Sequence, residues 1–147
     1  MLEEDFEFLI GWQPGTDWSE YVTSRRELAR STTVTPDQVP STLLMAVLDD
    51  EIIGRASVRF CLNEWLAWHA GHIGYGVLRE HRHQGYAPEI LQQALVVARA
   101  HGVDRVLVTC RDDNIPSAKV IEVCGGVLEQ VVPASAEDVA FRRYWIG

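Results

Sequence analysis

The stretch REHRHQGYAPEILQQALVVARAHG, residues 79–102, joins a basic loop to a long apolar helix. Apolar residues recur at helical spacing after Pro88, and Gly102 is the kind of residue that ends a helix, so we predict a helix from about Pro88 to His101. The loop before it contains no Ser, Thr, Asp or Asn that could cap the first turn. It is therefore expected to leave the first backbone N–H groups of the helix free for another partner.

Strands and helices alternate on both sides of this stretch. We predict strands at 42–50, 51–60, 72–78, 105–110, 126–132 and 141–146, and helices at 17–31 and 116–124. Residues 62–71 fit either a short helix or an ordered loop. Before Asp17 the only strand candidate is Phe6 to Ile10. The pattern predicts an α/β fold with a mixed sheet flanked by helices, in which the unit from 72 to 110 crosses over right-handed.

Composition limits the class of protein. The chain has 147 residues, 47% of them hydrophobic, which suits one domain over residues 1–147 with a substantial core. A net charge of −8 argues against a nucleic-acid partner, since such proteins normally carry a basic face. The N-terminus MLEEDFEFLI lacks the basic start of a signal peptide and any membrane-spanning run. The three cysteines include no Cys-x-x-Cys pair. We expect a cytoplasmic protein with reduced thiols and no membrane partner.

The loop at 82–87 has the features of an anion site. A helix N-terminus presents unpaired N–H groups and the positive end of the helix dipole, which suits a phosphate. Gly85 has no Cβ to keep a phosphate away, and Arg82 adds a cation that can donate two hydrogen bonds to phosphate oxygens. The glycine spacing is neither that of a Walker A loop nor that of a dinucleotide-binding fingerprint.

The segment GVLREHRHQGYAPEIL resembles motif A of the GNAT superfamily of acetyl-CoA-dependent N-acetyltransferases, whose signature Arg/Gln-x-x-Gly-x-Gly/Ala falls on residues 82–87. Downstream, TCRDDNIPSAKVIEVCGGVLE is similar to the second landmark of the superfamily, an Asn-x-x-Ser/Ala turn that leads into a helix and a glycine turn. LNEWL, GHIGYGV and RRYWI resemble one subgroup of these enzymes. The resemblance covers about residues 40–147 and implies the GNAT fold.

The resemblance also implies where acetyl-CoA binds. The backbone of the strand at 75–77 would pair with the pantetheine arm, and the Val77 amide would polarise the thioester carbonyl. The amides of 82–87 would hold the pyrophosphate, and Asn114 would contact the arm near its reactive end. The implied acetyl-CoA residues are Tyr75, Gly76, Val77, Arg82, His83, Gln84, Gly85, Tyr86, Ala87, Asn114 and Ser117.

The catalytic groups are less well specified. Many family members carry a tyrosine acid in the helix after Asn-x-x-Ser/Ala, and the matching position here is Ile121. Either another group, for which Tyr144 is a candidate, protonates the thiolate, or CoA leaves as the anion. For the base that removes a proton from the amine we favour His72, with Glu64 second, and a water chain is the alternative.

The resulting hypothesis is an N-acetyltransferase that moves acetyl from acetyl-CoA to a primary amine of a small molecule or peptide by direct attack. A non-catalytic acyl-CoA-binding module and a protein-interaction domain that keeps the fold are the alternatives. A homodimer could complete the acceptor pocket. The histidines at 69, 72, 81 and 83 lack carboxylates or thiolates at ligand spacing, so no metal is expected. Trp65 and Trp68 are candidates for a pocket wall.

Overall fold

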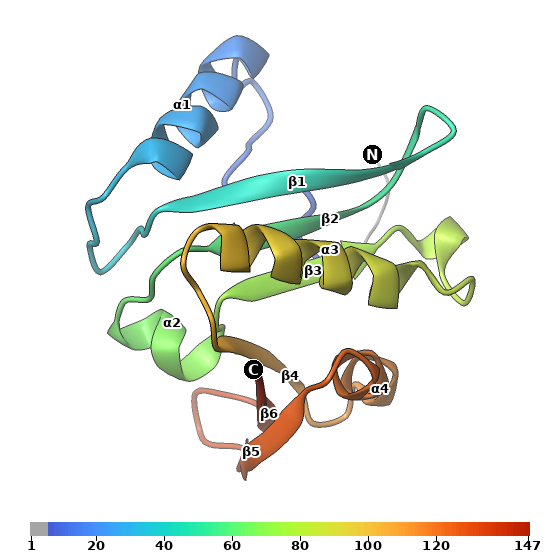
Figure 1. Cartoon of the computed structure of the whole chain (residues 1–147). Coiled ribbons are helices and arrows are strands. Elements are labelled where there is room, and N and C mark those ends of the chain that lie inside the picture. The colour runs from blue at the N-terminus through green and yellow to red at the C-terminus, as the bar shows by residue number, and fades with distance from the viewer. Residues whose placement is uncertain (1–5) are drawn as a thin grey trace.

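The predicted strands form two antiparallel sheets, which the computed structural model describes over residues 6–147 (Figure 1). Sheet A has the strand order β1-β2-β3, and sheet B has the order β4-β6-β5. The strands are β1 (Ser41–Leu48), β2 (Glu51–Arg59), β3 (Ile73–Val77), β4 (Val106–Arg111), β5 (Val127–Val132) and β6 (Phe141–Ile146). The helices are α1 (Trp18–Arg30), α2 (Glu64–His69), α3 (Tyr86–Ala100) and α4 (Ile115–Val123), and a 3-10 turn, η1 (Arg79–His81), precedes α3. The expected α/β class is confirmed.

β1 and β2 form an antiparallel hairpin. Leu48 pairs with Glu51, so Asp49 and Asp50 alone make the turn. Both aspartates have positive φ, 50° and 65°. Positive φ at both central residues defines a type I′ turn, whose twist matches that of the strands, and aspartate tolerates this region better than most residues.

The two sheets touch at one end and diverge from there. Gly71 forms an isolated bridge with Val108, and the His72 N–H donates to the oxygen of Leu107 at 2.8 Å. Beyond this point no described strand pairs with the outer edge of β3. The sheet expected from the sequence is thus split in two, and α3 connects its halves (Figure 1).

α3 covers one face of sheet A and closes the apolar core. Side chains alternate along a strand, so one set from β2 and β3 points at this helix. The core that they form with α3, α4 and sheet B includes Ala56, Val58, Ile73, Val77, Leu91, Ala94, Leu95, Val106, Val108, Ile121 and Tyr144. Their burial is the main favourable contribution to folding.

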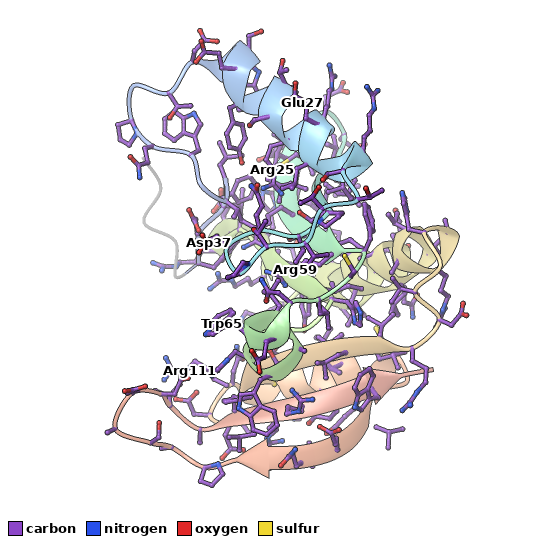
Figure 2. The ribbon with its side chains drawn as sticks, turned by 90° about the vertical axis from the view of Figure 1, so that its left-hand side faces the viewer. Arg25, Glu27, Asp37, Arg59, Trp65 and Arg111 are labelled. Atoms are coloured by element: carbon purple, nitrogen blue, oxygen red, sulfur yellow. The ribbon has the colours of Figure 1, made fainter. Side chains whose placement is uncertain are left out.

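The opposite face of sheet A is covered by other parts of the chain. The N-terminal segment lies on the far side of the sheet from α3, and α1 lies along β1 (Figures 1 and 2). Tyr21 of α1 is buried, and its hydroxyl donates to the oxygen of Ile10 at 2.9 Å. This bond holds the N-terminal segment against the helix.

The observed elements begin and end within about two residues of the predicted ones. The open choice for 62–71 is resolved as α2, because the Asn63 side chain accepts a hydrogen bond from the Leu66 N–H at 2.9 Å and so caps a short helix. Residues 6–10 form no strand. Over residues 6–147, no helix has the length and apolar character that crossing a bilayer requires.

Candidate active site

The outer edge of β3 is not paired with any strand among the described residues. The Arg59 N–H donates to His72 O, and the Leu78 N–H donates to Ile53 O, so the even-numbered residues of this strand bond to β2. In an antiparallel ladder the residues between them direct their N–H and C=O groups to the other side. Tyr75 and Val77 therefore face the gap between the two sheets, where an extended ligand could add as a strand.

The loop after β3 ends at a helix without a side-chain cap. Gly85 occupies the N-cap position of α3 and, having no side chain, makes no capping hydrogen bond to the first turn. The first amides of α3 thus point out of the helix together with the positive end of its dipole. Arg82 donates through Nε to the oxygen of Val77 at 3.0 Å, which fixes the loop against the end of β3. The prediction that this helix starts uncapped is confirmed.

The backbone conformation at position 85 favours glycine, and the lack of a side chain there leaves open space in front of α3. Its φ is +84°, a left-handed value that favours glycine, and a Cβ built at this position would meet nothing within 4 Å. An anion can therefore approach the uncapped amides without a side chain in the way.

A cavity of about 640 Å³ joins the open edge of β3 to the start of α3. Its remaining wall comes from α4, whose N-cap Asn114 accepts a hydrogen bond from the Ser117 N–H at 3.2 Å. The Tyr75 hydroxyl lies 2.9 Å from the Ser117 hydroxyl, and this hydrogen bond joins β3 to α4 at the wall of the cavity. The lining residues are Phe6, Tyr75, Gly76, Val77, His81, Arg82, His83, Gly85, Tyr86, Ala87, Pro88, Asn114, Pro116, Ser117 and Val120. All the acetyl-CoA residues expected from the sequence are among these except Gln84.

Phe6 and Val120 are among the wall residues that were not anticipated from the sequence. Phe6 lies against β3, and a Cβ at Gly76 would come within 2.6 Å of its ring. The absence of a side chain at Gly76 thus accommodates Phe6, whereas the sequence interpretation attributed this glycine to a ligand. On α4, Val120 lines the cavity and Ile121 is buried in the core, so the residue that matches the tyrosine position by sequence points away from the cavity.

His72 is poorly suited to the role of base expected for it. It is 9% exposed and lies at the end of β3 away from Val77, outside the cavity lining. Its Nδ1 accepts the Leu107 N–H at 2.9 Å, so the neutral ring carries its proton on Nε2 and has no free lone pair. Burial, followed by the charge of Arg59, lowers the pKa of His72. Both effects disfavour uptake of a proton from an ammonium group.

Tyr144 and Glu64 are also outside the cavity lining. Tyr144 is fully buried between sheet B and α4, and its hydroxyl donates to the Glu122 carboxylate at 2.9 Å. Glu64 is the first residue of α2, and its side chain is exposed. These positions remove the geometric basis for either residue as an acid or base beside the cavity.

The histidines that suggested a metal site have separate partners. His69 pairs with Asp138 at 3.1 Å, and His81 pairs with Glu51 at 3.2 Å. His83 is exposed on the loop. Within residues 6–147, no three His, Cys, Asp or Glu side chains gather as a metal site would require. The tryptophans at 65 and 68 pack on His69 and under Arg143, away from the cavity.

These features fit acetyl-CoA. The open edge of β3 matches an extended pantetheine arm, and the uncapped amides of α3 match a pyrophosphate. The open space at Gly85 admits the phosphates, which a side chain there would exclude.

The sequence matches the Acetyltransferase (GNAT) family over residues 5–125. Because this match covers most of the chain, the protein belongs to the GNAT family. It is an acetyl-CoA-dependent N-acetyltransferase, and acetyl-CoA is its acyl donor. A comparison with curated protein sequences gives no significant match.

Several solved structures share the fold. A GNAT-family acetyltransferase from Streptococcus pneumoniae has a TM-score of 0.65 at 22% identity, with 99% of this chain and 86% of that chain covered. RimJ from Mycobacterium smegmatis, solved with a CoA disulfide, has a TM-score of 0.66 at 19% identity and coverages of 91% and 66%. RimL, a ribosomal L7/L12 alpha-N-protein acetyltransferase solved with coenzyme A, has a TM-score of 0.62 at 21% identity and coverages of 88% and 72%.

Proposed function

We propose that this enzyme transfers acetyl from acetyl-CoA to a primary amine of a small molecule or a peptide by direct attack. The observation that carries the proposal is the cavity that joins the unpaired edge of β3 to the uncapped start of α3. An extended donor with a terminal pyrophosphate fills both features at once, and its reactive end then lies beside β3 and α4.

The backbone holds and polarises the donor in this proposal. The Val77 N–H faces the gap between the sheets and donates to the carbonyl that the amine attacks. The amides at the start of α3 and the guanidinium of Arg82 hold the phosphates. Acetyl-CoA bound in this way supplies an activated acetyl group.

Tyr75 stabilises the departing thiolate in this proposal. Its hydroxyl lines the cavity beside Ser117 of α4, the helix that carries the tyrosine acid in many family members. Burial raises the pKa of Tyr75 to about 12, so the hydroxyl stays protonated throughout the working pH range and can donate a hydrogen bond. This assignment replaces Tyr144 with a residue that lines the cavity.

Water removes the proton from the amine. The described lining of the cavity contains no carboxylate, and its two histidines, His81 and His83, belong to the phosphate loop. A water chain from the cavity to bulk solvent satisfies the requirement for a base without a dedicated side chain.

Peptide N-termini are the first acceptors to test. RimL, which shares the fold, is described as an alpha-N-protein acetyltransferase. The decisive measurement is release of CoA and formation of acetylated product, followed by mass spectrometry, over a panel of short peptides and small primary amines. Acetylation that increases with enzyme concentration supports the proposal. Hydrolysis of acetyl-CoA without any acetylated amine contradicts it.

A non-catalytic acyl-CoA-binding module is the alternative function. The absence of a dedicated acid at Ile121 and of a carboxylate in the described cavity lining favours it. Calorimetric titration with acetyl-CoA separates the two functions, with dephospho-CoA as the comparison. Micromolar binding without turnover on any amine supports the module, and binding with turnover supports the enzyme.

A further inference from the structure

Sheet A has one apolar face and one polar face. Ala56 and Val58 of β2 point into the core beneath α3. The intervening residues Arg55, Ser57 and Arg59 point to the opposite face because strand side chains alternate. Five buried polar or charged residues occur among the described residues, and four of them lie on this opposite face: Ser41, Arg55, Ser57 and His72.

Three arginines gather on the polar face and in the helix beside it. Arg55 and Arg59 come from β2, and Arg25 comes from α1. Figure 2 shows Arg25 and Arg59 one above the other, between α1 and α2. Burial, followed by the charges of Arg55 and Arg25, lowers the pKa of Arg59, so the charges of both other arginines act on Arg59. We call these three residues the arginine cluster.

The arginine cluster has no ion-pair partner among the described residues. Arg55 donates to the backbone oxygens of Gly74 at 3.3 Å and Glu7 at 2.7 Å. Arg59 donates to the oxygen of Gly71 at 3.0 Å. These acceptors are neutral carbonyls. Two carboxylates lie nearby: that of Glu7 acts on Arg55 through its field and accepts the Gly11 N–H, and that of Glu27 lines a cavity with Arg25.

Other arginines in the described part of the chain show the contrast. Arg111, Arg142 and Arg143 form ion pairs with Asp113, Asp112 and Glu129 respectively. Arginines elsewhere in this acidic chain thus form ion pairs with carboxylates. Leaving three cations without carboxylate partners on one partly buried face is costly unless an anion binds there.

Two members of the cluster have donors without a partner. Arg55 is 7% exposed, and its buried Nε–H makes no hydrogen bond in the structure. The Nε–H of Arg25 is also buried and without a partner. Native proteins seldom leave buried donors unsatisfied, so these two groups are unusual among the described residues.

The cluster adjoins both the donor cavity and a second cavity. The guanidinium of Arg55 stacks on Phe6 at 5.1 Å, and Phe6 forms part of the wall of the donor cavity. Arg25 lines a cavity of about 580 Å³ together with Tyr21, Ser24, Gln38 and the carboxylate-bearing Glu27. Phe6 thus connects the arginine cluster to the wall of the donor cavity.

We propose that the arginine cluster binds an anionic group, a carboxylate or a phosphate, on the acceptor amine. This inference rests on the proposed function, which it deepens by naming the acceptor class. Guanidinium groups donate paired hydrogen bonds to carboxylates and phosphates, and the guanidinium of Arg25 lines the second cavity, where such a group can reach it. The acceptor is then an amine with an acidic group, held by that group on the polar face.

A binding experiment tests the cluster without relying on turnover. The full chain is saturated with CoA so that the phosphate loop is occupied, and the arginine Nε–H signals are followed by NMR. The probes are butanoate, inorganic phosphate and the neutral butanamide. We expect saturable shifts of the Arg25 and Arg55 signals with at least one anion and none with butanamide. Equal responses to butanoate, phosphate and butanamide would overturn the proposal.

Two variants distinguish anion binding by the arginine cluster from a general effect of positive surface charge. R25Q removes a half-buried member of the cluster, and R26Q removes the exposed arginine next to it on α1. R25Q is expected to weaken binding of the anion roughly 10-fold or more, since hydrogen bonds to charged groups are strong. R26Q should leave it within about twofold. Equal weakening by both variants would show a charge effect without a site. R59Q provides a second test if R25Q disturbs α1.

Turnover then distinguishes this inference from the proposed function. The acceptors compared are 4-aminobutanoate, 3-aminopropyl phosphate and the neutral 4-aminobutanamide. We expect one of the two anionic amines to be preferred roughly 10-fold in kcat/KM and the preference to disappear in R25Q. Better acetylation of the neutral amine would contradict the proposed anion subsite but would still support the proposed acetyltransferase activity. Anion binding without acetylation of any amine would contradict the proposed function but would still support an anion site at the arginine cluster.

Discussion

The hydroxyl of Tyr75 lies 2.9 Å from the hydroxyl of Ser117, which links the open edge of β3 to the first turn of α4. Both residues line the cavity in which the resemblance to GNAT enzymes puts the reactive end of acetyl-CoA. A hydroxyl held in this position can stabilise a thiolate as it leaves.

Tyr75→Phe should slow the chemistry and spare donor binding. We expect kcat to fall roughly 10- to 100-fold, within the range for loss of a proton donor, and the Kd for acetyl-CoA to change less than about twofold. Tyr144→Phe is the matched control, because its hydroxyl bonds Glu122 in the core. Steady-state kinetics and calorimetry measure both. A kcat loss in Tyr144→Phe that exceeds the one in Tyr75→Phe would return the assignment to Tyr144.

Gly85→Glu should abolish binding of acetyl-CoA. The new carboxylate would occupy the open space before the uncapped amides of α3 and repel the phosphates. We expect a loss of affinity of about 100-fold or more, equivalent to about 3 kcal/mol. Gly102→Glu is the matched control, since Gly102 at the other end of α3 has nearly the same φ, +85°, and equally open space. Both variants lose a similar amount of stability, and only Gly85→Glu should lose acetyl-CoA binding in calorimetry. Normal binding by Gly85→Glu would refute the assignment of the phosphate loop.

His72 should make the protein less stable in mild acid. Its pKa in the folded protein lies below the ordinary 6.5, because of burial and then Arg59. The unfolded chain therefore takes up a proton first, so this contribution is complete above about pH 6.5 and is lost as the pH falls below it, by at most about 1.4 kcal/mol per pH unit. His72→Asn keeps an acceptor for the Leu107 N–H and does not titrate. Urea unfolding between pH 7.5 and 5.5 should show a smaller loss of stability in this variant than in the wild type. His83→Asn, at an exposed position, should follow the wild type.

Arg143 should be the more costly of two adjacent arginines to replace. It is buried on β6, donates to the Glu129 carboxylate at 2.6 Å and donates to the oxygens of Ala67 and Trp68 in α2. Arg143→Gln removes these hydrogen bonds and the ion pair with Glu129 and should lower the free energy of unfolding by about 2–4 kcal/mol. Arg142→Gln breaks a partly exposed pair with Asp112 and should cost about 1 kcal/mol or less. Denaturant unfolding compares the two, and equal losses would contradict the role given to Arg143.

The donor site could be predicted because its signals are local in the sequence. The uncapped helix start, its glycine and its arginine fall within residues 82–87, and these features depend on backbone conformation more than on distant packing. The strands and helices could also be predicted, because alternation of apolar and polar residues and helical periodicity are properties of short segments.

The catalytic side chains could not be predicted in the same way. The tautomer of His72 is set by a backbone N–H 35 positions away, at Leu107. Tyr144 was a plausible donor by residue type, but its register opposite Val108 in sheet B turns it into the core. The arginine cluster was missed because Arg25 and Arg59 lie on different elements, and only the packing of α1 on sheet A brings them together.

The contacts of Phe6 with Gly76 and of Glu7 with Arg55 affect how the enzyme should be produced. A tag or substitution introduced close to Phe6 and Glu7 would act on the wall of the donor cavity and on the arginine cluster. A tag at Gly147 would be attached away from both. Assays of acetylation should therefore use protein that carries a C-terminal tag or none, and weak activity of an N-terminal fusion should be attributed first to the fusion.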